Sequence, residues 1–167
     1  MTMTHIETIE LGTAAASITF SAISQDFTDL VILLSARSDR SGEQEDVAYL
    51  TFNSSTSNYS TLSLEGTGST VSSDTAGGQS SKFDRLDIPG PLFTSNTFGN
   101  ISLYISNYTQ AQAKSVSADL VEENNGTFAR QRINAYLWND TAAITSVTFT
   151  PIANFVTGTV ASLYGIS

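Results

Sequence analysis

Residues 101–106 read Ile-Ser-Leu-Tyr-Ile-Ser, so the aliphatic side chains fall on every second position. A period of two residues is that of a β-strand, whose successive side chains point to opposite faces of a sheet. The same alternation recurs over residues 17–22, 115–120, 133–138 and 146–150. This repeated pattern predicts a protein built from strands.

The polar residues and one apolar run support the same prediction. Ser, Thr and Asn outnumber charged residues, and these residue types suit solvent-facing strand positions and turns. Leu30–Leu34 is apolar at every position, which indicates a central strand covered on both faces.

The expected fold is a single all-β domain over residues 1–167, an antiparallel β-sandwich of the jelly-roll kind. Strands are expected at Ile6–Leu11, Ala16–Ile23, Asp29–Arg37, Val47–Phe52, Thr61–Glu65, Lys82–Ile88, Phe98–Asn107, Lys114–Glu122, Arg130–Asn139, Ile144–Thr150 and Thr157–Ile166. One alternative stays open, because Gln, Ala and Lys near the start of Thr109–Glu122 also suit a short helix.

Three segments are expected to lie outside the strands. Residues Met1–Ile6 are polar and unpatterned, which suggests a flexible N-terminal arm. Gly66–Ser81 consists almost entirely of small polar residues and glycine, which predicts one long, exposed and mobile loop. Ser38–Asp46 is a shorter, charged loop.

Charge and cysteine content restrict the partners. The formal net charge is −9 and the chain has no basic run, which argues against binding to nucleic acid or to an anionic membrane. There is no cysteine, so disulfides and thiolate metal sites are excluded. The start of the chain does not resemble a secretory signal, and we expect synthesis in a cytoplasm.

Catalytic and metal-binding patterns are weak. The one histidine, His5, lies near a chain end. Acid pairs that are close in sequence, Asp84 with Asp87 and Glu122 with Glu123, would suit hydrolysis only if they met in space. Oxygen ligands for Ca²⁺ occur in the Ser38–Asp46 loop, but their spacing is not that of an EF-hand. We therefore expect no enzyme activity, no cofactor and no metal.

Aromatic residues are the candidate binding residues. Tyr136 and Trp138 share one strand face, Tyr104 lies on the outward face of its strand, and Tyr108 follows closely. Such rings can stack on sugars or fill a protein interface. The alternative is that this face is simply the other half of the core.

Several runs resemble structural proteins of aquatic bacteriophages, cyanophages among them. The runs are Phe27–Ser38, Leu50–Asn53, Ser57–Ser60, Asn96–Asn100, Ile105–Thr109, Val121–Asn125, Leu137–Asn139 and Ala161–Ile166. The terminal Leu-Tyr-Gly-Ile and the Asn-Thr-Phe-Gly-Asn run carry most of the likeness, which spans nearly the whole chain.

The resemblance implies a part of the virion, in the capsid, the fibres or the tail, and it supplies no catalytic residue. Our leading hypothesis is a capsid decoration (cement) protein, a homotrimer that stabilises the phage head by multivalent contacts with the major capsid protein or other virion proteins. The runner-up is a tail or head fibre module that binds host-surface carbohydrate. A carbohydrate-active hydrolase comes third.

Overall fold

The computed structural model describes residues 2–167, whose regular structure is entirely β. In chain order the strands are β1 Met3–Glu10, β2 Ile18–Phe20, β3 Asp29–Ala36, β4 Glu45–Phe52, β5 Tyr59–Gly66, β6 Val71–Ser80, β7 Asp87–Pro89, β8 Gly99–Ile105, β9 Lys114–Glu123, β10 Ala129–Trp138, β11 Val147–Pro151 and β12 Val160–Ile166. Within this part of the chain, no helix is long and apolar enough to cross a membrane.

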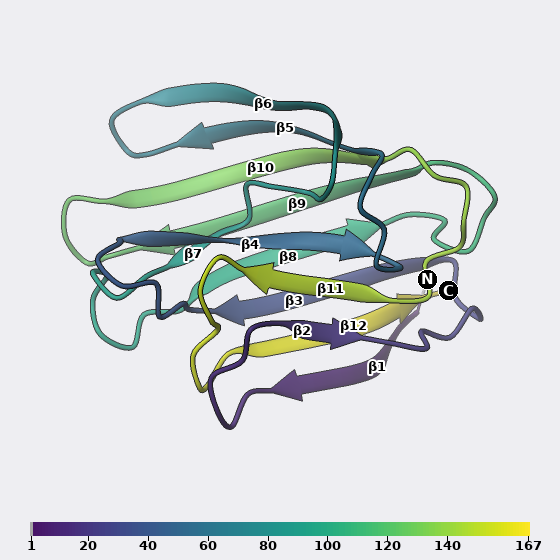
Figure 1. Cartoon of the computed structure of the whole chain (residues 1–167), viewed down its shortest axis with the longest axis horizontal. Helices are drawn as coiled ribbons and strands as arrows, with labels where there is room; N and C mark the ends of the chain where they lie inside the picture. Colours follow the sequence, from purple (N-terminus) through teal and green to yellow (C-terminus); the bar gives the residue numbers. More distant parts are fainter. Residues whose placement is uncertain (1) are drawn as a thin grey trace.

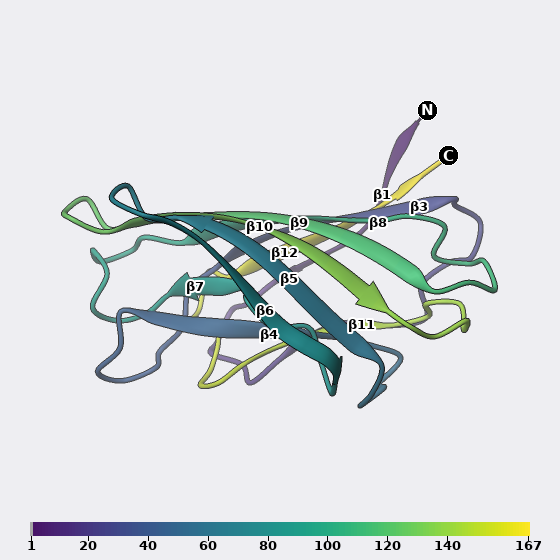
Figure 2. The same ribbon diagram turned by 90° about the horizontal axis from the view of Figure 1, so that it is seen from above.

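The strands form two antiparallel sheets (Figure 1). The large sheet has eight strands in the order β1-β12-β3-β8-β9-β10-β5-β6, and the small sheet has four in the order β2-β11-β4-β7. Figure 2 shows the large sheet lying over the small one, with the two chain ends side by side. Neither sheet closes on itself, so the all-β prediction is confirmed as two open, facing layers.

The pairing of strands follows one simple rule. When β5, β6, β9 and β10 are set aside, the first strand pairs with the last, β1 with β12. Moving inward from both ends then gives β2 with β11, β3 with β8 and β4 with β7. Two hairpins, β5–β6 and β9–β10, are added to this scheme, and both extend the large sheet beyond β8. The added hairpins carry most of the candidate functional residues.

Aromatic side chains fill the core beneath the added hairpins. Phe83 stacks on Tyr136 with ring centres 4.5 Å apart, and Trp138 meets Phe52 edge to face at 5.6 Å. The Tyr136 hydroxyl donates to the carbonyl of Asp84 at 2.7 Å, so its polar end is satisfied inside the protein. Each of these rings contributes on the order of 2 kcal/mol or more through burial.

The prediction of a long mobile loop at Gly66–Ser81 is wrong for most of its length. Val71–Ser80 forms β6, which pairs with β5 along the edge of the large sheet. Only residues 67–70 turn between the two strands, closed by the Thr67 N–H donating to the Thr70 carbonyl at 3.0 Å. An edge strand needs backbone pairing rather than buried apolar side chains, so a polar segment can occupy it.

The N-terminal arm is also not observed. Residues 3–6 belong to β1, whose register runs from Met3 opposite Ile166 to Glu10 opposite Val160. The Thr2 N–H donates to the Ser167 carbonyl at 2.8 Å, so pairing continues to the chain ends. Met1 lies outside the described residues.

Two other predictions from the sequence concern the secondary structure at Thr109–Glu122 and Lys82–Ile88. The helix alternative for Thr109–Glu122 is excluded, because Lys114–Glu123 is strand β9. The predicted strand at Lys82–Ile88 shortens to Asp87–Pro89, with one isolated bridge between Phe83 and Leu50.

Candidate functional site

The outer face of the large sheet carries an unusual set of exposed aliphatic side chains. On β10, Ile133 and Leu137 point to solvent, and Ile133 is 51% exposed. On β5, Leu62 and Leu64 do the same, with Leu62 58% exposed. The register places Ile133 opposite Leu64, so these side chains form one continuous strip across two strands.

This arrangement reverses the face assigned to the aromatic residues of β10. Tyr136 and Trp138 point into the core and are almost fully buried, as is Tyr108, whose hydroxyl donates to the carbonyl of Ser24. Three of the four rings predicted as a sugar or protein platform are therefore core residues, which was the alternative left open. Only Tyr104 remains part-exposed, and its hydroxyl donates to Asp29 at 2.5 Å.

A groove of about 700 Å³ crosses this outer face. We call it the outer groove. Its lining comes from five neighbouring strands and consists of Val31 on β3, Ser102, Leu103 and Tyr104 on β8, Ser117, Ala118 and Asp119 on β9, Ile133, Asn134 and Ala135 on β10, and Leu62, Ser63 and Leu64 on β5. Small outward residues on the central strands, Ser117 and Ala135, lie between larger ones on either side, which makes this part of the face hollow.

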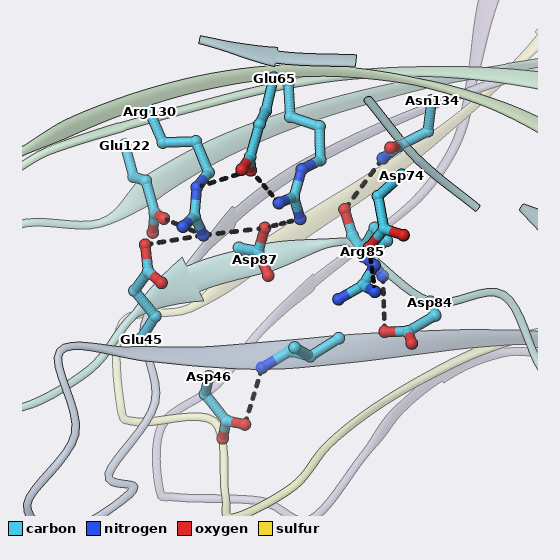
Figure 3. Close-up of polar contacts among 12 residues, drawn as sticks. Glu45, Asp46, Glu65, Asp74, Asp84, Arg85, Asp87, Glu122, Arg130 and Asn134 are labelled. Atoms are coloured by element: carbon cyan, nitrogen blue, oxygen red, sulfur yellow. Dashed lines mark hydrogen bonds and ion pairs between the residues drawn. The ribbon is translucent and has the colours of Figure 1, made fainter. Parts of the chain in front are cut away.

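The second feature is a cluster of charged side chains inside one end of the core (Figure 3). Arg130 and Arg132 on β10 point inward and meet carboxylates from four other strands. Those carboxylates are Glu45 on β4, Glu65 on β5, Asp87 on β7 and Glu122 on β9. We call this set the charge cluster.

Arg130 lies at its centre. Its guanidinium is 2.8 Å from Glu45, 3.1 Å from Asp87 and 3.2 Å from Glu65, and 3.6 Å from Glu122. Arg132 pairs with Glu65 and Asp87. The charge cluster thereby ties both added hairpins to strands β4 and β7 of the small sheet.

The charges of this cluster do not balance. Four carboxyl groups face two guanidinium groups, and the Glu122 side chain has no exposed surface. Neither Glu122 oxygen has a hydrogen-bond donor. Burial, followed by the neighbouring Glu45 carboxyl, raises the pKa of Glu122 to about 10. Glu122 is therefore protonated at neutral pH and can donate that proton to Glu45.

The other acids respond to the same surroundings in different directions. Burial raises the pKa of Asp87 even though both arginines oppose that effect. Burial also acts to raise the pKa of Glu65, but the hydrogen bond from Arg132 and the two positive charges outweigh it, so that pKa is lowered. Glu65 and Glu122 thus differ in charge at neutral pH although one cluster holds both.

Two hollows adjoin the charge cluster. A polar hollow of about 360 Å³ is lined by Glu45 and Asp87, and a second hollow of about 340 Å³ is lined by Glu122 and Arg130. Of the acid pairs considered from the sequence, Glu122 and Glu123 point to opposite faces: Glu122 points inward, whereas Glu123 points to solvent and accepts the Asn125 N–H at 2.6 Å. Of the pair Asp84 and Asp87, Asp87 belongs to the charge cluster. Asp84 instead accepts the N–H of Arg85.

The acidic loop considered for Ca²⁺ uses its oxygens internally. Asp46 is fully buried and accepts from the Ser38 hydroxyl at 2.7 Å and from the N–H of Ala153 at 3.1 Å. Asp39 accepts the N–H of Asn154 at 2.8 Å. Across residues 2–167, no group of three or more His, Cys, Asp or Glu is arranged to hold a metal ion.

His5 lies on the surface of β1, where it bonds to Thr8 at 2.8 Å and packs edge to face with Tyr164.

Comparison with known proteins gives no further assignment. No family model, no curated protein sequence and no solved structure matches the chain.

The pattern of the sequence predicts neither the aliphatic strip nor the charge cluster. Leu62, Leu64, Ile133 and Leu137 carry a normal strand alternation, which looks the same whether the apolar side faces a core or solvent. The charge pattern of β9 and β10 is a signal for the charge cluster, not for the inward face, because Arg side chains normally favour solvent unless they are paired. Arg130 and Arg132 share one strand face, and Glu122 is registered opposite Arg130.

Proposed function

We propose that this chain is a structural protein of a virus particle, specifically a capsid decoration protein of a bacteriophage, which attaches through the outer face of the large sheet. The observation that carries the proposal is the strip of exposed aliphatic side chains beside the outer groove. Soluble monomers rarely expose large contiguous apolar surfaces, and such surfaces commonly mark sites of protein association. The phage assignment rests on the sequence resemblance.

We also infer that the two sheets form a jelly roll, a fold common in viral capsid proteins. In this fold one long antiparallel hairpin is rolled up, so its first and last strands pair and the partners move inward from both ends. The four pairs β1–β12, β2–β11, β3–β8 and β4–β7 support this inference. The hairpins β5–β6 and β9–β10 are then insertions that widen one layer.

Multiple copies fit this role better than one strong contact. A decoration protein that assembles as a trimer would bind the shell at several points at once, so each contact can be weak while the whole is held firmly. The lack of cysteine makes stability independent of redox conditions, which suits a particle outside the cell.

The fibre module that binds carbohydrate ranks second. Three of the four rings of its expected sugar-binding platform, Tyr108, Tyr136 and Trp138, are buried in the core, and Tyr104 alone remains part-exposed. A single ring beside aliphatic residues is a weaker basis for sugar stacking than a row of rings.

Copy number in the particle tests the proposal. Quantitative mass spectrometry of purified phage that encodes this chain should find copies in a simple ratio to the major capsid protein, as for a shell component. A few copies per particle would favour the fibre function, and complete absence would refute the virion assignment.

A matched pair of variants tests the surface. Ile133→Ser on the outer face should weaken binding of the purified chain to particles that lack it. Ile152→Ser removes an aliphatic side chain of similar exposure, 49% against 51%, next to the small sheet, and should leave binding unchanged. Equal losses in both variants would show that the outer face is not the attachment surface.

A further inference from the structure

One carboxylate lies alone among the apolar side chains of the outer groove. Among the described residues that line it, Asp119, on the outward face of β9, is the one that carries a charge. The register places Asp119 between Ser102 of β8 and Ile133 of β10. None of the described residues donates a hydrogen bond to Asp119 or forms an ion pair with it.

A carboxylate beside the groove, Asp29, differs in that respect. Asp29 accepts the Tyr104 hydroxyl at 2.5 Å and the N–H of Asn107 at 2.7 Å, so its oxygens are already used. Among the described residues that line the groove, Asp119 is therefore the carboxylate left to bind a group that comes from outside the chain. Covering it with an apolar surface alone would remove water from an unpaired charge, which is costly.

This charge also argues against a second copy of the chain as the occupant. A two-fold pair centred on the outer groove would bring Asp119 close to its own equivalent, and like charges at short range repel. The groove is complementary to a positive group.

The position of the groove on a sheet face favours a helix over an extended segment. The backbone groups of β8, β9 and β10 are already paired within the sheet, so a strand laid across this face would find no backbone partners. A helix satisfies its own backbone hydrogen bonds and can place an aliphatic face into an apolar groove. Five strands span about 19 Å, which matches about 13 residues of helix.

We propose that the outer groove receives an amphipathic helix of a partner protein, with aliphatic side chains against Leu62, Leu64 and Ile133 and a Lys or Arg beside Asp119. This inference deepens the proposed function and rests on it for the identity of the partner as a virion protein. The chemistry of the groove itself is independent of that identity.

Two synthetic peptides of 14 residues test the proposal with the full chain. Both are amphipathic helices with a leucine face; one carries a Lys beside the leucines, and the other carries a Glu at that position. Fluorescence anisotropy should show that the Lys peptide binds about tenfold more tightly than the Glu peptide. Asp119→Asn should remove most of this difference in affinity. Glu7→Gln, which also replaces a carboxylate with an amide but lies on exposed strand β1, should leave the difference in affinity unchanged.

Three results would overturn the proposal. The peptides could bind equally well, or neither could bind. The chain could also form a dimer in solution that Ile133→Ser breaks and that excludes the Lys peptide, which would make a second copy the occupant. Failure of the virion assignment is detected separately, because it appears in the copy number of particles and leaves the preference for the Lys peptide unchanged.

Discussion

At the scale of single residues, Gly165 shows how one position in the terminal Leu-Tyr-Gly-Ile run is constrained. A side chain added at Gly165 would overlap the ring of Phe27, which lies directly against the backbone there. We expect Gly165→Ala to destabilise the protein by about 1–3 kcal/mol, because the ring or the strand must shift. Urea unfolding measures this loss.

Gly12→Ala is the matched control, because a side chain at Gly12 meets nothing within 4 Å. Its effect should stay within about 0.5 kcal/mol. Combining Gly165→Ala with Phe27→Ala should cost less than the sum of the two single changes, because the clash is gone. Full additivity would show that the ring does not impose glycine at this position.

The raised pKa of Glu122 leads to a second prediction at this scale, on how the free energy of unfolding depends on pH. Its pKa is raised from an ordinary value of 4.5 to about 10 in the folded protein. The folded state therefore holds a proton that the unfolded chain has released, and the stabilisation is complete only below the unfolded pKa. Between the two pKa values this contribution falls by about 1.4 kcal/mol per pH unit as the pH rises.

Glu122→Gln should remove that fall, because Gln is neutral at every pH and can donate its amide N–H to Glu45. The variant should match the wild type near pH 5 and exceed it increasingly toward pH 9, as measured by free energies of unfolding in urea. Glu65 acts in the opposite direction, since its pKa is lowered, but it is common to both proteins and cancels in the difference. A difference that does not change with pH would mean that Glu122 is ionised in the folded state.

At the scale of strands, β10 shows what sequence can and cannot predict. Its period of two residues correctly predicts a strand, and its bounds agree within a residue with the expected Arg130–Asn139. Both of its faces carry large apolar residues, so the period does not reveal which face is covered. The structure buries Tyr136 and Trp138, because the small sheet lies on that side, and leaves Ile133 in solvent.

Strands β6 and β7 show that alternation in the sequence also does not determine whether a strand forms. Alternation detects strands that bury one face, and β6 buries almost nothing from Val71 to Thr75. It forms because the edge of β5 offers backbone partners, and these come from the fold rather than from local composition. In β7, by contrast, all three residues are buried. Asp87–Pro89 pairs with β4 in regular register, and Phe83 adds an isolated bridge to Leu50 of β4.

The candidate site depends on both kinds of information. The outer groove draws its lining from five strands between β3 and β10 in the chain, and the charge cluster draws its members from β4, β5, β7, β9 and β10. No local pattern places such residues together, because strand order determines which of them become neighbours. Strands and the absence of thiolate sites can be predicted from the sequence, but the groove follows from the topology.

At the scale of the whole molecule, the pairing of first with last strand brings the chain ends together. Thr2 and Ser167 bond to each other through both backbone groups, at 2.8 and 3.1 Å. If the fold is a rolled hairpin, its stability should not depend on where the chain begins. A circular permutant that joins the ends by a few glycines and opens between Asn125 and Gly126 should therefore fold.

Asn125 and Gly126 lie in the exposed turn of the β9–β10 hairpin, and each of its strands keeps a second neighbour, β8 or β5, after the cut. We expect the permutant to lose only about 1–2 kcal/mol of stability, because just the entropy of one closed turn is given up. Circular dichroism and urea unfolding measure this. A permutant opened between Ile32 and Leu33, inside the central strand β3, should fail to fold, because β3 bridges β12 and β8. Failure of the first permutant as well would mean that the fold needs the intact β9–β10 hairpin, so that this insertion is part of the core architecture.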